Sequence, residues 1–128
     1  MKIVGFTQLH NELQNNNLHN WLKCMDVCSQ IYIWDQASSD GSLEVYKQNP
    51  KCVVVPNATN DFQNEQYCKS ELLKKLLAEQ PDTDYIFWMD GDYLLDGRYV
   101  KDDFALFRKL CDDAIRDGVE GIAFGHYN

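Results

Sequence analysis

The feature that most constrains the fold is a regular alternation of short apolar runs with longer amphipathic stretches. The runs are rich in β-branched and aromatic residues, which favour strands, and they lie at residues 3–6, 31–34, 52–55, 85–89 and 119–124. Between them, apolar residues recur every three or four positions, as in helices that bury one face. We therefore predict five strands alternating with four helices.

Capping and turn-forming residues limit these elements. We expect helices at 18–25, 42–46 and 64–79, and a last one from 102 or 103 to Gly118. Asn15 to Asn17 and Ser42 are the expected N-caps, and Pro56 should end the strand at 52–55. The alternation predicts one domain over residues 1–128, a three-layer α/β/α sandwich with a mainly parallel, Rossmann-like sheet. Ligands bind such sheets beyond the carboxyl ends of the strands.

Three loops should meet at that edge, over residues 7–12, 35–42 and 90–96. In the last of them, Asp90-Gly91-Asp92 follows the apolar run that ends at Met89. The glycine allows both carboxylates to turn toward one point and the backbone to approach closely. Paired carboxylates repel each other unless they are solvated or metal-bound, and their hard oxygens suit Mg²⁺ or Mn²⁺. Asp and Gly are also common turn formers, so the triplet has a structural interpretation too.

Three motifs in order resemble the N-terminal part of family 2 glycosyltransferases of the GT-A fold. They are Ile3-Val4-Gly5-Phe6-Thr7 leading to Asn11-Glu12, then Trp34-Asp35-Gln36-Ala37-Ser38-Ser39-Asp40-Gly41-Ser42, then Phe87-Trp88-Met89-Asp90-Gly91-Asp92. The second is close to the family's D-x-S-x-D-G-[ST] loop. The resemblance spans residues 2–96 and implies a domain that binds a UDP- or GDP-linked sugar with Mn²⁺ or Mg²⁺ and transfers the sugar to an acceptor hydroxyl, such as that of a carbohydrate.

For the nucleoside, the resemblance implies roles in the first two loops. Thr7 would line the base pocket, and Asp35, an acceptor only, would accept a hydrogen bond from the base. Ser38 and Asp40 would close the same loop near the nucleoside. Both residues fit an Asx-type turn and a helix cap equally well.

For the diphosphate and the metal, the resemblance implies three further residues. Asp90 would contact the ribose or the ion, and Asp92 would be the metal ligand. Lys69 stands where many relatives have arginine and would pair with the diphosphate, although a solvated helix lysine is the alternative. Apart from the resemblance, His126 lies beyond the last predicted strand and is a candidate for a third metal ligand or a sugar contact.

In inverting relatives a carboxylate base deprotonates the acceptor, and it follows the strand at which this chain ends. We therefore expect the general base and the C-terminal acceptor part to be missing, and the chain to be a truncated, donor-binding form. Asp96 and Asp102 come too early to replace the base. A catalytically inactive nucleotide-sugar-binding or interaction domain is one alternative. Another is a haloacid-dehalogenase-type phosphatase using Asp90 and Asp92, although that motif normally lies on the first strand.

Composition narrows the remaining classes. The formal net charge of -8 disfavours nucleic-acid binding. Five cysteines, an odd number at scattered positions, argue against a disulfide framework. They favour a location in a reducing cytoplasm. No apolar run is long enough to span a membrane, and no signal peptide is recognisable.

Overall fold

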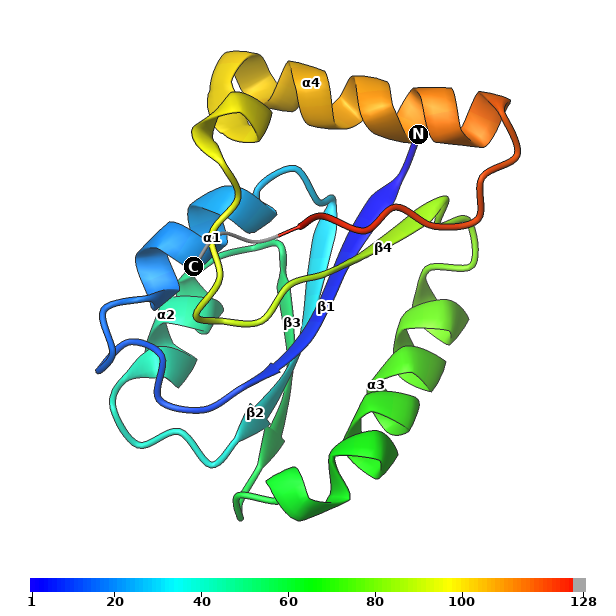
Figure 1. Ribbon diagram of the computed structural model, residues 1–128. Helices are drawn as coiled ribbons and strands as arrows, with labels where there is room; N and C mark the ends of the chain where they lie inside the picture. Colours follow the sequence, from blue (N-terminus) through cyan, green and yellow to red (C-terminus); the bar gives the residue numbers. More distant parts are fainter. Residues whose placement is uncertain (126–128) are drawn as a thin grey trace. The chain divides into compact units, whose positions relative to one another are not determined.

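The computed structural model describes residues 1–125, and the chain forms two compact units whose boundary falls between Leu94 and Leu95. The first unit holds the sheet (Figure 1). Its elements, in order, are β1 (Ile3–Leu9), α1 (Leu18–Met25), β2 (Gln30–Gln36), α2 (Ser42–Gln48), β3 (Cys52–Asn57), the 3-10 turn η1 (Phe62–Asn64), α3 (Glu65–Glu79) and β4 (Tyr85–Trp88).

All four strands run parallel, in the order β3-β2-β1-β4. β1 and β2 occupy the centre and are buried along most of their length, which explains why both read as nearly continuous apolar runs. β3 and β4 form the edges and are more exposed. The predicted α/β fold with a parallel, Rossmann-like sheet is confirmed.

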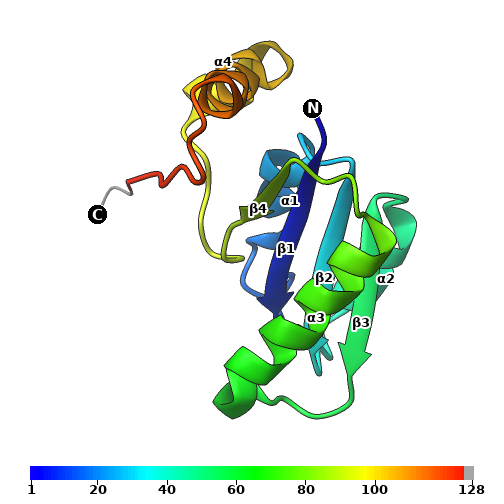
Figure 2. The same cartoon turned by 90° about the vertical axis from the view of Figure 1, so that its right-hand side faces the viewer.

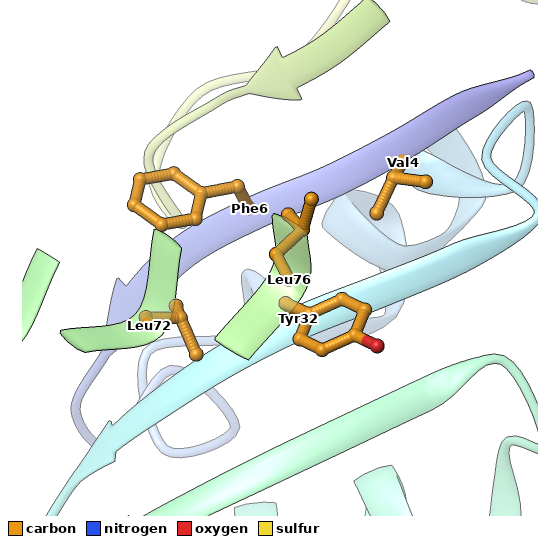
Figure 3. Packing of buried hydrophobic residues seen from close by; sticks show 5 residues of the cluster. All are labelled: Val4, Phe6, Tyr32, Leu72 and Leu76. Atoms are coloured by element: carbon orange, nitrogen blue, oxygen red, sulfur yellow. The ribbon is translucent and has the colours of Figure 1, made fainter. Parts of the chain in front are cut away.

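Helices cover both faces of this sheet, with α1 and α2 on one side and α3 on the other (Figures 1 and 2). The alternation of side chains along β1 supplies both interfaces. Val4 and Phe6 join Tyr32, Leu72 and Leu76 in a buried cluster between the sheet and α3 (Figure 3). Gly5 faces α1, and a Cβ there would lie 2.7 Å from Cε of Met25. The glycine therefore permits close packing of α1.

Several predicted boundaries differ in detail. β3 continues through Pro56 to Asn57, which an edge strand tolerates because one side of its backbone forms no ladder. Ser42 is the first residue of α2, and the cap position belongs to Gly41, whose φ is 97°. Asn17 precedes α1 without capping it through its side chain.

The second unit contains α4 (Gly97–Arg116). A first short helical segment, not predicted, begins at the Asp96 cap, whose carboxylate accepts from the Arg98 N–H at 2.9 Å. The backbone leaves helical geometry at Lys101–Phe104, and the long segment that follows this kink begins close to the predicted start at 102 or 103. Gly118 follows its end with φ 71°, as predicted.

The predicted strand at 119–124 is wrong, because residues 119–125 form no strand. The Val119 N–H bonds to the Ala114 carbonyl at 2.8 Å and continues the end of the helix. An apolar run becomes a strand only where another strand pairs with it, and the glycine at 121 further weakens its strand preference.

Among the helices that the structure describes, none has the length and apolar character needed to cross a membrane.

Candidate functional site

The loops that follow β1 and β2 are joined by reciprocal hydrogen bonds. The Asn11 N–H donates to Oγ of Ser38 at 3.0 Å, and the Ser39 N–H donates to Oδ1 of Asn11 at 2.8 Å. The Gln14 N–H donates to Oδ2 of Asp40 at 2.7 Å. Asn11 has a φ of 51°, a left-handed conformation that asparagine tolerates better than most residues. The two loops are therefore one connected structure.

The carboxylates of Asp35, at the end of β2, and of Asp40, in the loop that follows, both accept hydrogen bonds from neighbouring N–H and hydroxyl groups. Asp35 is 1% exposed, and its two oxygens accept from Oγ of Ser38 at 2.6 Å and from the Ser38 N–H at 2.9 Å. Oδ1 of Asp40 accepts from the N–H and the hydroxyl of Ser42 at 3.0 and 2.6 Å, an Asx-type turn. Burial raises the pKa of Asp40, but hydrogen bonds from Ser42 and Gln14 outweigh it and hold the pKa below its ordinary value.

Thr7 lies inside β1 and is 1% exposed. The prediction that it opens the first loop is wrong, because the strand continues to Leu9 and the loop begins at His10. At that point Nδ1 of His10 is hydrogen-bonded to the Gln36 carbonyl oxygen. This hydrogen bond joins the carboxyl ends of β1 and β2.

Gln36 is a buried polar centre that the sequence analysis did not identify. Its Nε2 donates to Oε1 of Gln8 at 3.0 Å, and its Oε1 accepts from Nδ2 of Asn57 at 3.2 Å and from the Asp61 N–H at 2.9 Å. This one side chain links the ends of β1, β2 and β3. The only signal in the sequence is a glutamine two positions after the apolar run at 31–34.

The Asp90-Gly91-Asp92 triplet follows β4 after one residue, Met89, and packs against the end of β1 and the loop after it. Buried Trp21 donates its Nε1–H to the Met89 carbonyl at 2.9 Å, which fixes the backbone before the triplet. A Cβ at position 91 would lie 2.6 Å from Cδ2 of Leu9 and 2.8 Å from Cγ of Glu12. Gly91 therefore lets the backbone approach these two side chains closely, and any larger residue would force them to move.

The two aspartates on either side of Gly91 are exposed. Among residues 1–125, neither carboxylate takes part in a hydrogen bond or ion pair; only the Asp90 carbonyl accepts, from the Tyr93 N–H at 3.1 Å. No group of three or more His, Cys, Asp and Glu side chains in the described residues could hold a metal ion. His126 lies outside those residues. The described donor set at this turn is two carboxylates, which suits a divalent cation whose other ligands are oxygens of a bound nucleotide or water.

Lys69 lies on α3, and its charge is already paired. Its Nζ is 2.5 Å from Oε1 of Glu65 and 4.2 Å from the centre of the Trp88 ring. The hydrogen bond from Lys69 holds the pKa of Glu65 below its ordinary value. The Lys69 ammonium thus contacts the aromatic ring of Trp88, the last residue of β4.

The loop after β1 connects the predicted site residues. Its Asn11 and Gln14 bind the loop that contains Ser38 and Asp40, and its Glu12 packs against Gly91. The predicted meeting of the three loops at one edge is therefore present in the structure. The polar groups of these loops differ in their hydrogen bonds: Asp35 and Asp40 accept from neighbouring groups, whereas Asp90 and Asp92 are exposed.

Comparisons with protein-family models, with curated proteins and with solved structures gave no match for this chain. The fold defines a class only: a small α/β domain with a four-stranded parallel sheet.

Proposed function

We propose that the chain binds a UDP- or GDP-linked sugar together with Mn²⁺ or Mg²⁺, as a glycosyltransferase or as its donor-binding part. The observation that carries this proposal is the pair of exposed carboxylates at Asp90 and Asp92, which have no partner among the described residues. Two anions held near each other by one turn repel, and a divalent ion would remove that repulsion. The order of the three motifs along the sequence supports a nucleotide sugar as the ligand.

In this proposal each loop has a distinct task. Asp92 holds the ion, and Asp90 contacts the ion or the ribose. A divalent ion bound there would neutralise the charge that develops on the departing diphosphate. Asp35 and Asp40 act through Ser38 and Ser42 to give the loop beside the nucleoside a fixed shape.

Calorimetry on the full chain tests the proposal directly. UDP and GDP are titrated with and without Mn²⁺ into the wild type and into Asp92→Asn, with Asp112→Asn as a matched control that removes one exposed charge from α4. We expect metal-dependent binding that Asp92→Asn weakens at least about tenfold and that Asp112→Asn leaves unchanged.

Two results would contradict this account: nucleotide binding that needs no metal, or metal-dependent binding that is equal in the wild type and Asp92→Asn. Release of inorganic phosphate from a phosphomonoester, lost in Asp90→Asn, would instead support the phosphatase alternative.

A further inference from the structure

A groove of about 370 Å³ lies between α3 and the end of β4, within the first unit. Its apolar lining comes from Phe6, Leu73, Ile86 and the ring of Trp88. Binding sites for small molecules are typically concave, mostly apolar and about 300 to 1,000 Å³ in volume, with a few polar groups that orient the ligand. The groove has the size and lining of such a site.

Trp88 is the main aromatic surface of this groove. It is 54% exposed, whereas Trp21 is fully buried. Phe6 packs edge-on against its ring, with centroids 6.3 Å apart, and the Lys69 ammonium lies 4.2 Å from its centre. These contacts hold the ring in place, with the Lys69 ammonium over one of its faces, while about half of the surface of the whole residue stays exposed. A fixed aromatic surface loses little conformational entropy when a ligand packs on it.

Two polar side chains of α3 lie beside this apolar surface. Gln66 and Ser70 are four residues apart, so they lie on one face of the helix, and both line the groove. Both are exposed, and neither side chain makes a hydrogen bond to any residue that the structure describes. An amide and a hydroxyl are therefore available to a ligand.

The charge of the groove favours a neutral ligand. Its one lysine, Lys69, is paired with Glu65 at 2.5 Å, and the whole chain carries a formal net charge of -8. An anionic ligand would meet this negative field, and the paired lysine would offset it little. A neutral ring with an apolar face and several hydroxyl groups matches the aromatic surface and the two polar side chains.

We propose that this groove binds a neutral saccharide ring, which packs its C–H face on Trp88 and bonds its hydroxyl groups to Gln66 and Ser70. Trp88 stands two positions before Asp90 in the sequence. In a transferase of the kind proposed above, a saccharide bound beside the donor site would be the acceptor. The acceptor role rests on the proposed function, whereas the binding of the saccharide does not.

The test titrates methyl α-glucoside, N-acetylglucosamine, maltose and cellobiose into the full chain, without metal or nucleotide. Indole N–H signals in ¹H–¹⁵N spectra and tryptophan fluorescence report binding. We expect at least one saccharide to bind with a millimolar Kd, to shift the Trp88 signal and to leave Trp21 unchanged. Trp88→Ala should weaken binding about tenfold, and Gln66→Ala or Ser70→Ala about threefold.

Tyr67→Ala is the matched control, because Tyr67 is an aromatic residue of α3 that is 62% exposed and does not line the groove. It should bind the saccharide like the wild type. The proposal is overturned if no saccharide shifts the Trp88 signal or if Trp88→Ala binds the saccharide as tightly as the wild type. The proposal is also overturned if ultracentrifugation shows that the wild type self-associates and that Trp88→Ala does not. The groove would then be an interface between copies of the chain.

The two proposals fail separately. Saccharide binding without metal-dependent nucleotide binding would remove the transferase and retain the saccharide site. The reverse result would retain the donor site and remove the saccharide site.

Discussion

Two aspartates lie at the end of β2 and in the loop that follows it, two others lie in the loop after β4, and the surroundings of the two pairs differ. Asp35 and Asp40 accept hydrogen bonds from Ser38, Ser42 and Gln14. Asp90 and Asp92 are exposed, and no described residue bonds to their carboxylates. A carboxylate near the end of a parallel strand can therefore be a structural acceptor or a group that is open to a ligand.

This difference separates two kinds of experimental effect. Removing a carboxylate that the protein already satisfies leaves buried donors unpaired, so the folded state loses free energy. Removing an exposed carboxylate without a partner changes stability little and changes only what the site can bind. Substitutions in the two loops should therefore show opposite patterns.

The largest effect on stability is expected for Asp35→Ala. The substitution leaves the N–H and the hydroxyl of Ser38 without their acceptor, so the free energy of unfolding should fall by about 3 kcal/mol in urea denaturation. Asp92→Ala is the comparison and should change it by less than about 0.5 kcal/mol. Equal losses for the two variants would remove the distinction between the loops.

A smaller loss is expected for Gly91→Ala. The new Cβ would overlap Cδ2 of Leu9 and Cγ of Glu12, at 2.6 and 2.8 Å. The free energy of unfolding should therefore fall by about 2 kcal/mol. Gly97→Ala is the matched control, since a Cβ there meets nothing within 4 Å. Thermal unfolding of both variants measures the difference. An unchanged melting temperature for Gly91→Ala would show that the triplet does not pack tightly on the first loop.

The smallest effect concerns the pH dependence contributed by Asp40. Because its folded-state pKa lies below the ordinary value of 3.8, its ionised form stabilises the fold above pH 3.8, and this contribution is lost as the pH falls below 3.8. Asp40→Asn should lower the free energy of unfolding by about 1 kcal/mol at neutral pH, and by less in acid. Urea unfolding over a pH series gives both values.

Ser42→Ala removes one of the hydrogen bonds that lower the pKa of Asp40, so it should weaken the same pH dependence. If Asp40→Asn costs the same free energy at every pH, Asp40 is not held by these hydrogen bonds in its charged form.

Much of the architecture follows from patterns in the sequence. Short apolar runs rich in β-branched and aromatic residues predict the four strands, helical periodicity predicts the helices between them, and the parallel sheet then brings the three loops to one edge. The glycine of the triplet also predicts the close backbone approach seen at Gly91. These features depend on the local preference of residues for strand, helix or turn, which a single sequence shows, and on general rules of sheet topology.

The partners of individual polar groups could not be predicted. Asp35 and Asp90 both follow apolar runs, yet Ser38 binds only the first of them. The Trp21 contact with Met89 spans 68 positions, and no local pattern encodes it. The strand expected at 119–124 failed for the same reason, because strand formation depends on a pairing partner that the run itself does not specify.

The most direct test of the central claim is to locate a bound Mn²⁺ by paramagnetic broadening of amide signals in the presence of UDP. The account predicts that broadening is strongest at Gly91 and Asp92, weaker at Ser38 to Ser42, and lost in Asp92→Asn. Broadening centred on Ser38 to Ser42, or broadening that is unchanged in Asp92→Asn, would contradict the assignment of the exposed carboxylate pair as the metal site.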